Sequence, residues 1–148
     1  MQLTSVAFQN GASLPADYTC KGRGVSPPLT IADAPEGTQS LALIMHDPDA
    51  VGGRDFLHWA VWNLPPDTAR IDEGHLPAGA VQGTNAYPNQ LYGPACPPAG
   101  SGLHRYIFDL YALDTVLDLP AGASRQELEA SISGHTLATA QLIGAVQS

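Results

Sequence analysis

Three runs of hydrophobic residues stand out along the chain, and each has the length and composition of a β-strand. They are SLALIMH from Ser40 to His46, FLHWAVWNL from Phe56 to Leu64, and LHRYIFDLYAL from Leu103 to Leu113. Apolar side chains, many of them branched or aromatic, make up most of each run, and turn residues or prolines follow the first two. The pattern predicts three strands, of which the first is buried and the third lies centrally in its sheet.

Shorter elements and long turns fill the rest of the chain. Residues 3–8 (LTSVAF) predict a short opening strand, whereas segments 10–28 and 74–102 are rich in turn residues and predict loops. Gly and Pro are spread along the chain without a repeating period, which favours strands over long helices. We expect a mainly β fold, a sandwich of antiparallel sheets with one or two peripheral helices.

One helix is clearly marked at its start. SRQE, beginning at Ser124, matches a capping box, in which a Ser N-cap is followed three residues later by Glu127. Gly134 is well placed to end this helix. The apolar segment 137–147 comes next, and its periodicity fits either a helix or a strand.

Length and composition predict a single domain over residues 1–148. Hydrophobic residues make up 44% of the chain and charged residues only 14%, which is enough apolar material for one core. The formal charge of −8 argues against a nucleic-acid partner, because it repels the phosphate backbone. No apolar stretch approaches the roughly 20 residues that span a bilayer. We therefore expect a cytoplasmic protein with no membrane span.

A titratable side chain stands at one end of each main strand: Asp47, His58 and His104. Strict alternation places His58 on the face of Ala60 and Trp62. A single His on an apolar strand is more often a satisfied core residue, so the prediction depends on all three strand ends meeting at one rim. They would then form a small pocket in which the imidazoles hold an anion and Asp47 fixes a tautomer. Affinity should weaken as the pH rises.

The sequence also leaves an enzyme open, although no complete catalytic set is present. A hydrolase or lyase acting on small phosphoesters or esters would use His58 or His104 as general base, oriented by Asp47. No metal-site, P-loop or dinucleotide-binding motif is found, and we expect no metal and no cofactor. Ser101 lies in AGSGL, which lacks the first Gly of a nucleophile elbow, so we interpret it as a turn residue.

Two cysteines, Cys20 and Cys96, are too far apart in sequence for a zinc knuckle. Two buried thiols are the simpler interpretation. Both residues stand in loop-like sequence, YTCKG and GPACPP, so a disulfide between them stays open, although a reducing cytosol would disfavour it.

Several motifs together resemble those of phosphatidylethanolamine-binding proteins, also called Raf kinase inhibitor proteins. They are DPDA at 47–50, HWAVWNLP at 58–65 and GPACPPAGSGLHRYIFDLYALD at 93–114. The run TCKGRGVSPPLTI at 19–31 and the ending SGHTLATAQLIGAV resemble the short prokaryotic branch of that family. The likeness covers nearly the whole chain, and DPD followed by GPxxPPxGxGLHRY is highly specific.

The resemblance implies a Greek-key sandwich of two antiparallel sheets with an anion-binding cavity at one end, and it makes the last apolar segment a strand. Matched to the family motifs, the residues around the cavity are Asp47, His58, Cys96, Pro98, His104 and Tyr106. The implied ligand is a phosphate-like group, such as a phosphoethanolamine head group or a phosphorylated side chain. The implied protein is a non-enzymatic binder, with a kinase or protease as a regulated partner. A homodimer stays open.

Two positions depart from the family pattern. Val51 follows DPDA where the family commonly has Pro, which predicts a looser and wider cavity lip. Ile31 stands where many relatives have Trp, which predicts an apolar wall that is no longer aromatic.

Overall fold

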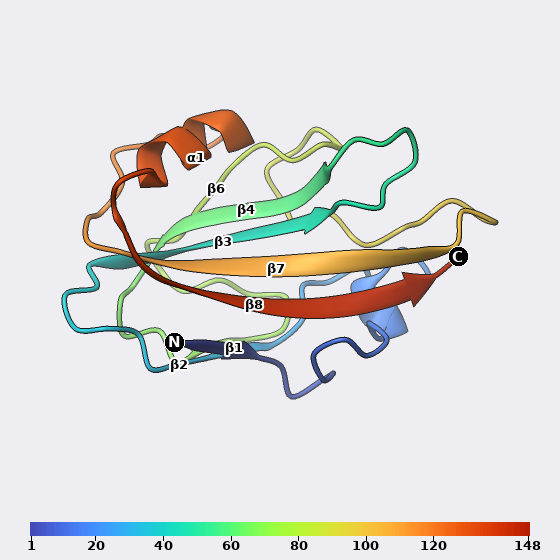
Figure 1. Ribbon diagram of the computed structural model, residues 1–148, viewed down its shortest axis with the longest axis horizontal. Coiled ribbons are helices and arrows are strands. Elements are labelled where there is room, and N and C mark those ends of the chain that lie inside the picture. Colours follow the sequence, from blue (N-terminus) through green and yellow to red (C-terminus); the bar gives the residue numbers. More distant parts are fainter.

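The computed structural model describes residues 1–148 as two antiparallel β-sheets and one α-helix (Figure 1). The smaller sheet has the strand order β1-β2-β5, formed by Gln2–Thr4, Leu29–Ala32 and Arg70–Ile71. The larger sheet has the order β6-β4-β3-β7-β8, formed by Val81–Gln82, Phe56–Leu64, Ser40–Asp47, Leu103–Leu113 and Thr136–Gln147. Helix α1 spans Arg125–Ile132, and a short 3₁₀ helix, η1, spans Ala16–Tyr18. The predicted mainly β fold is confirmed.

The main core lies between the two sheets, where alternate residues of the long strands face the smaller sheet. Leu43 of β3, Phe108 of β7 and Leu29 of β2 are fully buried there. The opposite face of the larger sheet packs against α1, with Ile44 and Leu128 in a second buried cluster. Figure 1 shows α1 on the far side of that sheet from β1 and β2. Strand β3 is therefore buried on both faces, which explains its uninterrupted apolar run.

The best-marked elements of the sequence form as predicted. The three hydrophobic runs are β3, β4 and β7, and residues 137–147 lie in strand β8. At the start of α1, Glu127 N–H donates to Ser124 Oγ and Ser124 N–H donates to Glu127 Oε1, each over 3.1 Å. Neither α1 nor η1 has the length and apolar character that crossing a bilayer requires.

The opening strand is shorter than predicted, because β1 ends at Thr4. Ser5 Oγ donates to Pro28 O over 2.6 Å and accepts the N–H of Ala7 over 3.1 Å. These side-chain bonds compete with the strand ladder and turn the chain away from it. Val6 is left 88% exposed, so the prediction of a strand was wrong for residues 5–8.

A β-bulge in β4 corrects the predicted placement of His58. The residues on either side of His58 pair with consecutive residues of β3, which leaves His58 with no partner across the ladder. The alternation of faces therefore resets, and Leu57 joins Ala60 and Trp62 in the cluster under α1. His58 does not share their face, as strict alternation predicted. The extra residue turns it toward the end of the sandwich where β3 ends.

Cys20 and Cys96 form a disulfide, which joins the loop after η1 to the segment before β7. Both residues are exposed, so the simpler interpretation of two buried thiols was wrong. The two segments also meet through their backbones, because Cys20 N–H donates to Ala95 O over 2.9 Å. The sequence left a disulfide between these two cysteines open, and the structure contains it.

Candidate functional site

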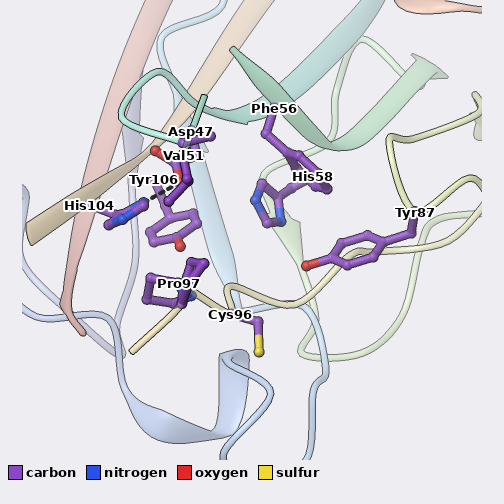
Figure 2. A pocket seen from close by; sticks show the side chains of 11 residues that line it. Asp47, Val51, Phe56, His58, Tyr87, Cys96, Pro97, His104 and Tyr106 are labelled. Carbon is purple, nitrogen blue, oxygen red and sulfur yellow. Dashed lines mark hydrogen bonds and ion pairs between the residues drawn. The ribbon is translucent and has the colours of Figure 1, made fainter. Parts of the chain in front are cut away.

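A cavity of about 360 Å³ opens at the end of the larger sheet where β3 ends and β4 and β7 begin. The residues expected around a binding site all line it: Asp47, His58, Cys96, Pro98, His104 and Tyr106. Figure 2 shows the rings of His58, His104 and Tyr106 around one space, with the sulfur of Cys96 directed away from them. The fold thus brings these side chains together from segments that lie far apart in the sequence.

Further residues complete the lining: Ala50, Val51, Phe56, Tyr87 and Pro97. The rings of Phe56 and Tyr87 pack edge to face with centroids 5.1 Å apart, and they form an aromatic wall beside His58. Sequence reasoning did not assign these two residues. A signal for Tyr87 was present, because an aromatic side chain inside a loop rich in Gly, Pro and Asn has no strand to pack in.

Asp47 and His104 form a buried pair in the cavity wall. His104 Nδ1 lies 2.7 Å from Asp47 Oδ2, and their side chains are only 1% and 4% exposed. Asp47 Oδ1 accepts the N–H of Asp49 over 2.8 Å. His104 Nε2 lies 2.8 Å from Ser101 Oγ, whose hydroxyl donates to Pro98 O over 2.6 Å. Every polar group in this network is satisfied when His104 carries both ring protons, so that Ser101 accepts from Nε2.

His58 differs from His104, because one of its ring nitrogens is unpaired. Its Nδ1–H donates to Gly93 O over 2.8 Å, whereas Nε2 has no hydrogen-bond partner in the protein. Burial lowers the pKa of His58 below its usual value, although the bond to Gly93 and the charge of Asp47 oppose that shift. Neutral His58 therefore has a lone pair, and not an N–H, at Nε2.

Tyr106 supplies a hydroxyl to the same space. Burial raises the pKa of Tyr106 above its usual value, and the charge of Asp47 acts in the same direction. The phenol therefore stays protonated and can donate a hydrogen bond. Its ring packs edge to face on His58 with centroids 5.1 Å apart. No group of His, Cys, Asp and Glu side chains in the structure is arranged to hold a metal ion.

The loop between β3 and β4 forms the lip of the cavity and is anchored at both ends. Near its start, Arg105 donates to both carboxylate oxygens of Asp49, over 2.8 and 2.9 Å. These bonds lower the pKa of Asp49 to about 2. At its end, Asp55 lies 2.8 Å from His46 Nδ1, and Asp109 lies 2.9 Å from His46 Nε2. Sequence reasoning did not find either anchor. Arg105 and Asp49 are far apart in the chain, and the two partners of His46 come from different segments, the loop end and β7.

Asn85 organises the loop that carries Tyr87. Its buried side-chain amide donates to Asn89 Oδ1 over 2.8 Å, and its Oδ1 accepts the N–H groups of Tyr87 and Asn89 over 2.9 and 3.0 Å. The same loop continues to Gly93, whose carbonyl holds His58. Asn85 therefore supports two parts of the cavity wall without lining it.

The two departures from the family pattern lie in different places. Val51 lines the cavity and is 65% exposed, at the lip where the sequence located it. Ile31 lies in the main core and does not line the cavity. The expectation that Ile31 forms a cavity wall was therefore wrong, because β2 belongs to the other sheet.

Comparisons with known proteins agree with this architecture. A family model described as phosphatidylethanolamine-binding protein matches residues 4–147. A UPF0098 protein of Methanothermobacter thermautotrophicus is 46% identical over 149 residues, which cover 97% of this chain and 97% of that protein.

Two solved structures are similar over almost their whole length. The phosphatidylethanolamine-binding protein homologue CT736 of Chlamydia trachomatis superimposes with a TM-score of 0.93 at 41% identity, covering 99% of this chain and 97% of that one. Escherichia coli YbcL, described as a member of the mammalian PEBP family, has a TM-score of 0.93 at 32% identity, covering 99% and 98%. The chain belongs to the phosphatidylethanolamine-binding protein family, in its prokaryotic branch.

Proposed function

We propose that this protein is a binding protein whose cavity takes the phosphate-like group of a small ligand. The observation that carries the proposal is the unpaired Nε2 of His58, in a cavity that also holds the hydroxyl of Tyr106 and the imidazole of His104. The remaining walls are mainly apolar and would shield a bound anion from water, which strengthens its polar contacts.

Binding of an anion should be coupled to uptake of a proton. In the free protein, both ring nitrogens of His104 already face protein atoms, Ser101 Oγ and Asp47 Oδ2. Protonation of His58 would turn Nε2 into a donor and add a positive charge beside the ligand. A bound phosphate dianion should therefore raise the pKa of His58, and affinity should fall as the pH rises.

Calorimetry tests this coupling with inorganic phosphate as the probe. Titrations in two buffers of different ionisation enthalpy should reveal uptake of about one proton per phosphate at a pH where free His58 is neutral. His58→Gln should bind more weakly and lose the proton uptake. His135→Gln, which changes an exposed histidine outside the cavity, is the matched control. Phosphate binding that is absent at mildly acidic pH, or that is unchanged in His58→Gln, would contradict the proposal.

The ligand that carries the phosphate group can be identified by comparing three compounds. Phosphoethanolamine represents a lipid head group, O-phosphoserine represents a phosphorylated side chain, and inorganic phosphate is the reference. Tighter binding of one ester than of phosphate would indicate which source the cavity recognises. Regulation of a kinase or protease stays a prediction from the family resemblance, and a phosphorylated segment of such a partner should then compete with phosphate.

A further inference from the structure

Ser101, His104 and Asp47 form a hydrogen-bonded chain from the protein surface to a buried carboxylate. Ser101 is exposed, and its Oγ lies 2.8 Å from His104 Nε2. His104 Nδ1 lies 2.7 Å from Asp47 Oδ2. A hydroxyl, an imidazole and a carboxylate linked in this order are the groups that activate a serine for nucleophilic attack. The anion-binding proposal assigns no role to Ser101.

We propose that Ser101 is a nucleophile that reacts with esters of small carboxylic acids, with His104 as its general base and Asp47 as the residue that positions the base. Sequence reasoning treated Ser101 as a turn residue, and it does lie in a turn, since its N–H donates to Pro98 O over 3.1 Å. The turn presents the hydroxyl at the surface and holds it against the imidazole.

The same heavy-atom positions accommodate two arrangements of protons. When His104 carries both ring protons, Ser101 accepts from Nε2 and its hydroxyl donates to Pro98 O over 2.6 Å. When Nε2 loses its proton, it can accept the hydroxyl of Ser101, while Pro98 O keeps its bond from the Ser101 N–H. Loss of one proton therefore changes Ser101 from an acceptor into an activated donor.

The reaction balances without any group from outside the protein except water. Ser101 Oγ attacks the acyl carbon of the ester and its proton passes to His104 Nε2. The tetrahedral adduct then expels the alcohol, which leaves with that proton and with the electrons of the broken C–O bond. A water molecule repeats the sequence on the acyl-serine, releasing the carboxylic acid and restoring Ser101.

The turn also offers hydrogen-bond donors for the negatively charged oxygen of the tetrahedral adduct. The backbone N–H groups of Ala99 and Gly100 donate to no protein acceptor, and they are the nearest free donors in sequence to Ser101. A small cavity of about 180 Å³ lies beside this turn; Ala99 and Ser148 line it, whereas Ser101 does not. Ser148 accepts the N–H of Gly102, next to Ser101, over 2.7 Å. We limit the substrate class to short acyl chains because a larger acyl group would exceed this space.

General-base attack requires a lone pair at His104 Nε2, so acid should slow the attack. Ionisable groups face this imidazole from three sides, whereas the residues of β8 opposite β7 carry none. They are Asp47 of β3, Asp49 of the following loop, which Arg105 pairs, His58 of β4 and Tyr106 of β7. A rise of the rate with pH is opposite in sign to the pH dependence expected for anion binding.

An alkyl fluorophosphonate tests the proposal, because it transfers its phosphonyl group to an activated serine with loss of fluoride. Mass spectrometry of the labelled protein should show one adduct, located on Ser101, which forms faster as the pH rises. Labelling should be absent in Ser101→Ala and about 100-fold slower in Asp47→Asn and His104→Gln. Ser133→Ala, which changes another exposed serine, should label like the wild type.

Several outcomes would overturn the proposal. They are no adduct, an adduct on another residue, or an adduct on Ser101 whose rate is independent of pH. Should Asp47→Asn fail to fold, the pH profile of the wild type and the exposed Ser101→Ala substitution still decide the question. Ser101→Ala should retain phosphate binding, so a failure here is distinguishable from a failure of the binding proposal.

Discussion

The two histidines of the cavity differ because of the bonds that their ring nitrogens make. Both nitrogens of His104 face protein atoms, Asp47 Oδ2 at 2.7 Å and Ser101 Oγ at 2.8 Å. His58 donates only from Nδ1, to Gly93 O. A ligand can therefore bond to His58 Nε2 directly, whereas both ring nitrogens of His104 are already engaged by the protein.

Tyr106→Phe tests the contribution of the Tyr106 hydroxyl to anion binding. Removing that group should weaken phosphate binding about five-fold, because a hydrogen bond of this kind contributes about 1 kcal/mol. Calorimetry measures the effect, and denaturant unfolding should show that stability is retained. Tyr111→Phe, on the same strand but away from the cavity, is the control. Equal affinity of the Tyr106 variant and the wild type would show that the hydroxyl does not contact the anion.

Asn85→Ala should be among the most destabilising polar substitutions in the chain. It removes the partner of several loop groups and leaves them without a hydrogen bond, so we expect the free energy of unfolding to fall by about 3 kcal/mol. Urea unfolding measures the loss, with the exposed Gln90→Ala as its control. A loss no larger than that of the control would mean that the loop is held by its other contacts.

At the residue scale, the sequence revealed the polar groups at strand ends but not those that support them. Asp47, His58 and His104 could be found because a charge next to an apolar run is conspicuous. Asn85 could not, since its buried position depends on how a long loop folds back on itself. Alternation also misplaced His58, because a bulge leaves no local mark in the sequence.

At the level of elements, His46 links the lip of the cavity to β7 through Asp55 and Asp109. Burial alone would lower the pKa of His46, but its bonds to Asp109 and Asp55 outweigh burial and raise it above 6.5. The resulting stability is fully present below pH 6.5 and is lost as the pH rises through the raised pKa. The contacts of His46 with Asp55 and Asp109 should therefore weaken in alkaline solution.

His46→Gln tests the contribution of these contacts to stability when urea unfolding is measured over a series of pH values. The stability difference between wild type and variant should be largest in mildly acidic solution and should shrink as the pH increases. The lowered pKa of His58 costs stability as the pH falls, and taking the difference removes this contribution except for the part due to the charge of His46. His75→Gln, an exposed histidine, is the control. A difference that does not vary with pH would show that His46 acts only by packing.

Elements with strong local signals were predictable, and those decided by distant contacts were not. The long apolar runs and the capping box at Ser124 gave β3, β4, β7 and the start of α1. The opening strand stopped early because Ser5 bonds to Pro28, which is remote in sequence. Strand β8 was ambiguous by periodicity because many of its residues are half-buried or exposed, so its alternation is weak. It pairs with β7 along its length, whereas residues 10–14 bond only part of its other edge.

At the scale of the whole molecule, the disulfide ties the loop after η1 to the cavity wall. Cys20 and Cys96 are separated by 76 positions, so the bond closes a long loop in the unfolded chain. Replacing both by Ser should lower the free energy of unfolding by about 4 kcal/mol in the chain-entropy picture. Urea unfolding with and without a thiol reductant measures this. The reductant should weaken the wild type to the level of the double variant and leave that variant unchanged; an unaffected wild type would contradict the prediction.

The sandwich as a whole could be predicted from its strands, but not the pairing of its cysteines. Buried strands and frequent turns require two packed layers, whatever the order of the strands. A disulfide instead requires two Cα atoms to approach closely, here to 5.3 Å, and sequence spacing does not report that distance.

The bulge at His58 makes the cavity depend on the number of residues in β4 as much as on their identity. Deleting one residue there would restore regular pairing with β3 at that point, while the second irregularity of this ladder, between Leu41 and Leu43, would remain. The imidazole would, however, be replaced in the cavity by a neighbouring apolar side chain. Relatives can therefore vary the cavity by substitution, whereas a one-residue gap in this strand would leave the fold intact and remove the site.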